Sequence, residues 1–185
     1  STDYVFNGKN TAPYQVTEPT RPIGVYGQTK HEGEQIILNS ESNSLIIRTS
    51  WVFSSFGNNF VKTMLRLGKD RNELNVVSDQ VGQPTYAHDL ALATMSIIDS
   101  GTEIGAKGKL YHYSNKGAIS WFQFAGKIME LGHTNCTVHP ISTEDYPTRA
   151  ERPKYSVLDT SKIEKDYDLT IANWENALAR CLIAV

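Results

Sequence analysis

The chain has 185 residues, of which 39% are hydrophobic, and its formal net charge at pH 7 is −2. This content suits one domain of ordinary size or two small ones, and the near-zero charge favours neither nucleic acid nor an anionic membrane as a partner. No apolar run approaches the roughly 20 residues of a transmembrane helix, and no signal peptide is evident, so we expect a cytoplasmic protein.

Helical and strand patterns alternate from the first residues onward. Residues 1–6 have the pattern of the end of a strand, and three prolines and the Asn7-Gly8 pair mark 7–22 as a loop. A helix with a Glu-rich middle is predicted over 24–40. The apolar run 45–49 is typical of a buried parallel strand.

The remaining segments continue the alternation. They are a helix over 60–67 that Gly68 closes, a strand over 75–78, a helix over 89–98, a strand over 109–115, a helix over 120–131 capped by Ser120, a strand over 137–141, and two short helices after 161, the second over 173–182. This order predicts an α/β fold with a mostly parallel sheet. A dinucleotide-binding fold normally starts with a Gly-x-Gly-x-x-Gly turn, and this sequence contains none.

The strongest chemical signal is the pair Tyr26 and Lys30, which lies on one face of the predicted helix because residues four apart are neighbours there. One such pair is close to what random placement gives, so its context carries the argument. Ser1-Thr2 stands upstream, and a Pro-rich stretch and a glycine-containing turn precede the helix. A hydroxyl, a phenol and an ammonium group are the parts needed to deliver a proton to a carbonyl.

Six ordered blocks of sequence point to a family. They are Ser1–Gly8, Val25–Lys30 with Gly33-Glu34, Arg48–Phe53, Asn59–Val61 with Met64-Leu65, Asp79–Thr85, and Arg152-Pro153 with Ser156–Thr160. Together they resemble the C-terminal part of the extended short-chain dehydrogenase/reductase family, most closely its reductases of dTDP-linked 4-keto-6-deoxysugars. In that family a further segment with the Gly-rich turn precedes the Ser-Thr pair, so we expect this chain to be a C-terminal fragment without that cofactor-binding segment.

The resemblance implies an NAD(P)-binding Rossmann-like fold with a truncated parallel sheet and a smaller substrate-binding lobe. Residues 1–83 and about 88–113 would form the C-terminal part of the Rossmann-like domain. Residues about 76–87 and 114–185 would form a discontinuous substrate-binding lobe.

The resemblance also implies roles for the first residues. Thr2, Tyr26 and Lys30 would be catalytic, with Tyr26 as proton donor to the sugar ketone and Thr2 bonding the substrate oxygen. A free phenol has a pKa of about 10, so such a donor needs a nearby positive charge, which Lys30 would supply. Tyr26 and Lys30 would also bind the cofactor, NADPH or NADH, at its nicotinamide ribose.

Substrate contacts are implied for Thr2, Asp3 and Trp51. Arg152 is a candidate for the substrate diphosphate, since guanidinium groups suit phosphate, and a surface salt bridge is the alternative. The stretch Arg48–Ser50 follows a strand, so contact near the nicotinamide or a simple turn at the sheet end both fit. Cys136 and Cys181 lack the spacing of a metal site, and we predict no metal.

The implied reaction is NAD(P)H-dependent reduction of the 4-keto group of dTDP-4-dehydro-6-deoxy-L-mannose to dTDP-L-rhamnose, with the fragment inactive alone and a homodimer possible. The 4,6-dehydratases carry Thr-Asp-Glu where this chain has Thr2-Asp3-Tyr4, which argues against dehydration. The alternative is a non-catalytic binding subunit, because the regulatory subunit of methionine adenosyltransferase resembles the same reductases.

Overall fold

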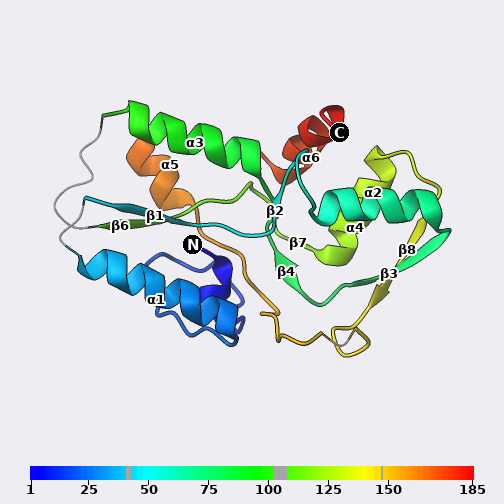
Figure 1. The fold of residues 1–185 in the computed structure, drawn as a ribbon, viewed down its shortest axis with the longest axis horizontal. Helices are drawn as coiled ribbons and strands as arrows, with labels where there is room; N and C mark the ends of the chain where they lie inside the picture. Colours follow the sequence, from blue (N-terminus) through cyan, green and yellow to red (C-terminus); the bar gives the residue numbers. More distant parts are fainter. Residues whose placement is uncertain (41–42, 102–107, 147) are drawn as a thin grey trace.

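A computed structural model describes residues 1–40, 43–101, 108–146 and 148–185 (Figure 1). Its helices are α1 (Val25–Asn39), α2 (Phe60–Asp70), α3 (Ala87–Asp99), α4 (Trp121–Leu131), α5 (Ser161–Tyr167) and α6 (Trp174–Ile183), with a 3-10 turn η1 at Asp3–Val5. Its strands are β1 (Leu45–Arg48), β2 (Val52–Phe53), β3 (Glu73–Val77), β4 (Val81–Gly82), β5 (Thr85–Tyr86), β6 (Lys109–His112), β7 (Ile119–Ser120) and β8 (Thr137–Ile141). The predicted α/β class is confirmed.

Parallel pairing dominates the strands. β1 pairs with β6, β2 with β5 and β3 with β8 in parallel, and only β4 with β7 among the described strands is antiparallel. Thr2 joins the β1 edge through a parallel bridge to Thr49. In Figure 1, α1 lies on one side of the β1–β6 pair, and α3 and α5 lie on the other.

The prediction that 1–6 form the end of a strand is wrong beyond Thr2. The Thr2 hydroxyl accepts a hydrogen bond from the backbone N–H of Tyr4, which caps the 3-10 turn that follows. Local capping of this kind competes with strand pairing. The chain therefore turns away from the sheet directly after the bridge to Thr49.

The larger core joins α2, α4 and α6 with β3 and β8. Ser120 caps α4 as predicted, through a capping box with Gln123. Gly68 does not close its helix, because α2 continues to Asp70 and Gly68 is buried inside it. A Cβ at Gly68 would collide with the sulfur of Met129, so the glycine permits the close approach of α2 to α4.

A second core unites α3, β6 and α5, with Ile97, Tyr111 and Ile163 nearly inaccessible. The division into two lobes given above stays a proposal. The packing differs from this division at two places. α2 and β3 fall within residues 1–83 but share their core with α4, and α5 falls within 114–185 but packs beside β6.

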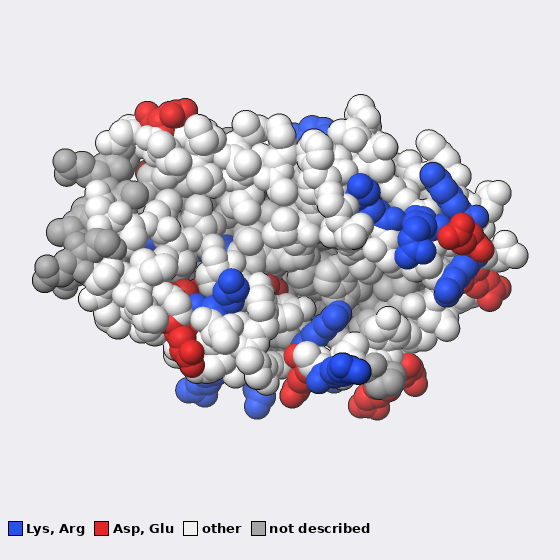
Figure 2. Space-filling view, in the orientation of Figure 1, with Lys and Arg blue, Asp and Glu red and all other residues white. Residues whose placement is uncertain are grey.

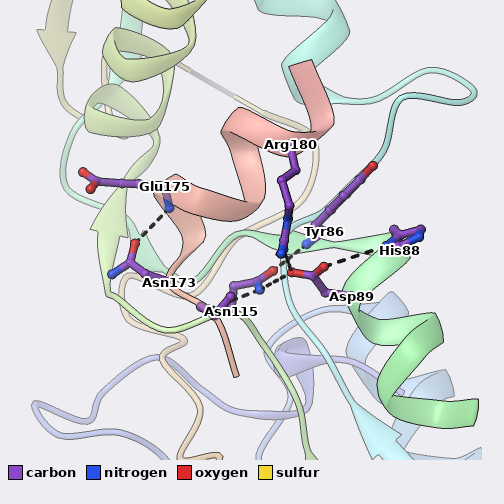
Figure 3. A network of polar contacts seen from close by, with 8 residues as sticks. Tyr86, His88, Asp89, Asn115, Asn173, Glu175 and Arg180 are labelled. Carbon is purple, nitrogen blue, oxygen red and sulfur yellow. Dashed lines mark hydrogen bonds and ion pairs between the residues drawn. The ribbon is translucent and has the colours of Figure 1, made fainter. Parts of the chain in front are cut away.

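A buried polar junction ties the two cores together, as Figure 3 shows. Asp89 near the start of α3 accepts hydrogen bonds from Asn115 and from Arg180, which reaches across from α6. Asn115 in turn accepts from the backbone N–H of Tyr86, at 2.8 Å. Each partner comes from a different segment, so the junction fixes α3 relative to α6.

Among the described residues, none of the helices is long and apolar enough to cross a membrane.

Candidate functional site

Tyr26 and Lys30 project from the open flank of α1, in its first two turns. Tyr26 is 55% exposed, and Lys30 is exposed as well. The Nζ atom of Lys30 lies 5.8 Å from the centre of the Tyr26 ring. The predicted phenol and ammonium groups are therefore neighbours on a surface that a ligand can reach.

The 3-10 turn η1 packs directly against the start of α1. The rings of Tyr4 and Tyr26 meet edge to face, with centroids 6.0 Å apart. Gly27 faces the carbonyl oxygen of Tyr4 so closely that a Cβ at this position would collide with it. A glycine is needed there, and it brings the helix of Tyr26 up to the segment that carries Thr2.

Thr2 and Asp3 form a buried hydroxyl–carboxyl pair beside this contact. The Thr2 hydroxyl donates to Asp3 Oδ1 at 3.0 Å, and both residues are almost inaccessible. Asp3 Oδ2 has no hydrogen-bond partner of good geometry among the described residues. Burial raises the pKa of Asp3 to about 7, and the neighbouring hydroxyls of Ser156 and Thr2 oppose this only in part. The carboxyl can thus hold a proton near neutral pH.

Tyr4 is the second phenol at the site, and sequence reasoning gave it no role beyond arguing against a dehydratase. Burial, and then the negative charge of Asp3, raise the pKa of Tyr4 to about 12, although Arg152 acts in the opposite direction. Tyr4 therefore remains a neutral, weakly acidic phenol, whereas Tyr26 is the phenol open to a substrate.

Two pockets meet at Arg152. One, of about 460 Å³, is lined by Tyr4, Tyr26 and residues 149–153. The other, of about 600 Å³, lies between α2, β3 and the segment after β8. Figure 2 shows the surface hollowed below α2, with basic side chains at the rim. The structure thus brings Tyr26 and Arg152 into one pocket, and Arg152 also lines the second pocket. The residues that line the pocket of Tyr26 include neither Thr2, which is buried, nor Lys30.

Trp51 lies away from the pocket that Tyr26 lines. It stacks on Trp121 with ring centres 3.6 Å apart, and its backbone has a φ of 45°. Trp121 lines the 600 Å³ pocket. Any contribution of Trp51 to that pocket therefore passes through Trp121.

Arg48 is not available to a nicotinamide, because it is 3% exposed and bound to Glu34 of α1 at 2.8 and 2.7 Å. Its other side lies 3.3 Å from His112 Nε2. Sequence reasoning included Glu34 in a family block but gave neither Glu34 nor His112 a role. The sequence shows only that residues 28–35 of the helix contain no apolar side chain, which does not identify the polar partners.

The described residues contain no cluster of three or more His, Cys, Asp or Glu that could hold a metal ion. Cys136 and Cys181 are buried free thiols. Burial raises the pKa of both, which makes them poor nucleophiles.

Comparison with known proteins identifies relatives along the whole chain. The family model described as "RmlD substrate binding domain" matches residues 1–185. The spore coat polysaccharide biosynthesis protein SpsK of Bacillus subtilis is 43% identical over 98% of this chain and 62% of its own length. The dTDP-4-dehydrorhamnose reductase of Aggregatibacter actinomycetemcomitans is 41% identical over 96% of this chain and 63% of its own length.

Solved structures that resemble this chain include proteins of the same name. The dTDP-4-dehydrorhamnose reductase of Bacillus anthracis, in complex with NADP, superimposes with a TM-score of 0.93 at 40% identity, over 100% of this chain and 64% of that one. The Clostridium acetobutylicum orthologue gives a TM-score of 0.91 at 38% identity, over 99% and 63%. The chain therefore spans a little under two thirds of the length of these relatives.

Proposed function

The chain belongs to the RmlD substrate-binding domain family, and we propose that it supplies the substrate pocket and the proton-transfer residues of an NAD(P)H-dependent reductase. The proposed reaction reduces the 4-keto group of dTDP-4-dehydro-6-deoxy-L-mannose to dTDP-L-rhamnose. One observation carries the proposal: Lys30 lies beside Tyr26 on the open flank of α1, and Tyr26 itself lines a pocket that it shares with Arg152.

Tyr26 acts as the general acid in this scheme. Its hydroxyl passes a proton to the sugar oxygen as negative charge develops there, and the ammonium group of Lys30 stabilises the phenolate left behind. No hydrogen bond or ion pair within the described part of the chain engages Lys30 Nζ, so it is also open to a ribose hydroxyl. The pair therefore fits the nicotinamide ribose of NADPH or NADH, which supplies the hydride when bound.

Thr2 is proposed to bond the same sugar oxygen, and Asp3 decides whether it can. When Asp3 is ionised, the single proton of the Thr2 hydroxyl is committed to Asp3 Oδ1, which lies 3.0 Å away. When Asp3 carries the proton, it can donate to Thr2 Oγ1, and the Thr2 proton is free for the substrate oxygen. The pKa of about 7 makes both states accessible at neutral pH.

The chemical parts of the proposed substrate are assigned to different places in the two pockets. The reacting sugar lies in the pocket of Tyr26, and Arg152 at the junction takes the diphosphate, since a guanidinium fork matches phosphate oxygens. The nucleoside extends into the 600 Å³ pocket, whose lining includes the aromatic rings of Phe60 and Trp121. Trp51 holds Trp121 in place by stacking.

The test compares turnover of the 4-keto sugar nucleotide by wild type and Tyr26→Phe. It uses the completed protein, meaning this chain together with the part of its relatives' length that it does not span. We expect kcat to fall on the order of a hundredfold or more, with dTDP-L-rhamnose affinity nearly unchanged. Normal turnover in Tyr26→Phe would refute the proton-donor assignment. A completed protein that binds but never turns over would favour the non-catalytic alternative.

A further inference from the structure

Within the 185-residue chain, the helix that carries Tyr26 and Lys30 buries few apolar side chains. Within α1, all of which the structure describes, only Gly27 and Glu34 are buried. Val25 is 81% exposed and Ile36 is 73% exposed, so neither provides an anchor. Most helices in globular proteins are held by an apolar stripe that faces the core. Within the 185-residue chain, packing of this kind does not fix α1.

The two buried residues form the inner face of α1. Gly27 and Glu34 are seven residues apart, which is close to two turns of an α-helix, so they lie one above the other. Tyr26 and Lys30 lie on the adjoining flank. The position of the inner face therefore sets the direction in which the phenol and ammonium groups point.

Glu34 is held by a two-pronged ion pair. Arg48 Nε donates to Glu34 Oε1 at 2.8 Å, and a terminal nitrogen of Arg48 donates to Oε2 at 2.7 Å. The two side chains are 2–3% exposed. Burial would raise the pKa of Glu34, but hydrogen bonds from Arg48 and Ser1 outweigh it and the pKa is lowered. The carboxylate thus stays ionised in its buried place.

Arg48 is itself fixed at the edge that carries Thr2. Its third nitrogen lies 3.3 Å from His112 Nε2 on the neighbouring strand, and its guanidinium stacks over Phe6 at 5.1 Å. The next residue, Thr49, forms the parallel bridge to Thr2. The ion pair therefore connects the helix of Tyr26 to the strand end that holds Thr2.

A buried ion pair adds little net stability, because desolvation offsets most of the attraction, but its directional bonds allow one geometry. We propose that Glu34 is a positioning residue of the reductase: through Arg48 it sets the rotation and depth of α1, and hence the place of Tyr26 relative to Thr2. This inference rests on the proposed function given above.

The structural arm of the test uses the 185-residue chain itself. Glu34→Asp keeps the charge but shortens the side chain by one methylene, so we expect α1 to shift toward Arg48. The nuclear Overhauser effect between the Tyr4 and Tyr26 rings, which meet edge to face, should weaken or vanish. The matched control is Glu32→Asp on the same helix, where Glu32 is exposed and bonds only Gln28 among the described residues. It should leave the ring contact unchanged.

The kinetic arm uses the completed protein. Glu34→Asp should lower kcat on the order of tenfold to a hundredfold, because small misplacements of reacting groups are costly, while KM for the sugar nucleotide changes less than about twofold. Glu32→Asp should match wild type in both constants. Urea titration reports which variants fold. If Glu34→Asp does not fold, Arg48→Lys repeats the test by changing the other partner of the ion pair.

An unchanged ring contact and an unchanged kcat in folded Glu34→Asp or Arg48→Lys would overturn the inference. So would a loss that appears in KM alone. A completed wild-type protein without turnover would instead count against the proposed function, and the ring contact in the 185-residue chain would still decide whether Glu34 positions Tyr26.

Discussion

Two regions of this molecule are held together by different physics. The core of α2, α4 and α6 is apolar, with Val61, Phe124, Ile128 and Leu178 fully buried. The edge formed by η1, α1 and the end of β1 buries charged and polar groups instead, and each has specific partners. Apolar packing fixes the first region without regard to pH, whereas the second depends on which groups carry protons. The residues proposed to do chemistry belong to the second region.

The largest expected effect breaks the apolar region. Phe124→Ala removes a ring that lies within 5.7 Å, centre to centre, of Phe53, Phe60 and Trp174. We expect the free energy of unfolding to fall by about 3–5 kcal/mol. Urea denaturation of the 185-residue chain measures it, and the loss should be the same at pH 5 and pH 8.

Phe56→Ala is the matched control, because Phe56 is 83% exposed and its truncation should change the free energy of unfolding by less than about 0.5 kcal/mol. A small loss in Phe124→Ala, or one that depends strongly on pH, would show that the two regions are not as distinct as the burial pattern indicates.

The next prediction concerns pH and the polar edge. Burial lowers the pKa of His112 to about 4, whereas it raises the pKa of Asp3 to about 7. Below its ordinary pKa of about 6.5 the unfolded chain protonates His112 and the fold does not, so this group makes stability rise with pH between 4 and 6.5. The fold keeps a proton on Asp3 that the unfolded chain loses, so Asp3 makes stability fall with pH between 4 and 7.

In wild type, the opposite effects of His112 and Asp3 on the free energy of unfolding should nearly cancel between pH 4 and 6.5. In Asp3→Asn only the His112 contribution remains, so the free energy of unfolding should rise with pH by up to about 1.4 kcal/mol per pH unit. His112→Gln should leave the opposite slope, with stability falling as pH rises. Urea titrations at half-unit intervals of pH measure both. Equal slopes in the two variants would contradict the assignment of the shifts.

Asp3→Asn also tests the proposed role of Asp3 in the completed protein. The asparagine amide can donate to Thr2 Oγ1 at any pH, so Thr2 would always be free to donate to the substrate. Turnover of wild type should therefore decline above pH 7, and that decline should be weaker in Asp3→Asn. An identical pH profile would show that Asp3 does not control Thr2.

The two regions also differ in how far the sequence predicted them. Strong local patterns sufficed for α4, whose cap at Ser120 was predicted, and for β8, whose bounds match. The two-residue strands β2, β4, β5 and β7 were missed, because pairing with distant segments defines them. Gly68 was misread for a related reason, since its function is contact with Met129 of α4 rather than termination of α2.

At the polar edge the sequence provided the reacting groups but not their supports. Tyr26 and Lys30 were singled out by their spacing together with the upstream Ser1-Thr2, and the family resemblance implied the role of each. Glu34 and Arg48 are fourteen residues apart, and His112 lies sixty-four residues beyond Arg48. Only the pairing of β1 with β6 brings that third residue to the ion pair. Local spacing carries no signal for such contacts.

The smallest expected effect concerns cofactor binding by the 185-residue chain. The polar edge offers Tyr26 and Lys30 to a ribose, but the sequence contains no Gly-rich turn that could receive a pyrophosphate at a helix N-terminus. A few ribose hydrogen bonds, each worth roughly 0.5–1.5 kcal/mol net, barely offset an association cost of at least about 4 kcal/mol. We therefore expect calorimetry to detect no NADPH binding below millimolar concentration. dTDP-L-rhamnose, which would use Arg152 and both pockets, should bind more tightly than NADPH. Micromolar NADPH binding would show that this edge contains a more complete cofactor site than its residues indicate.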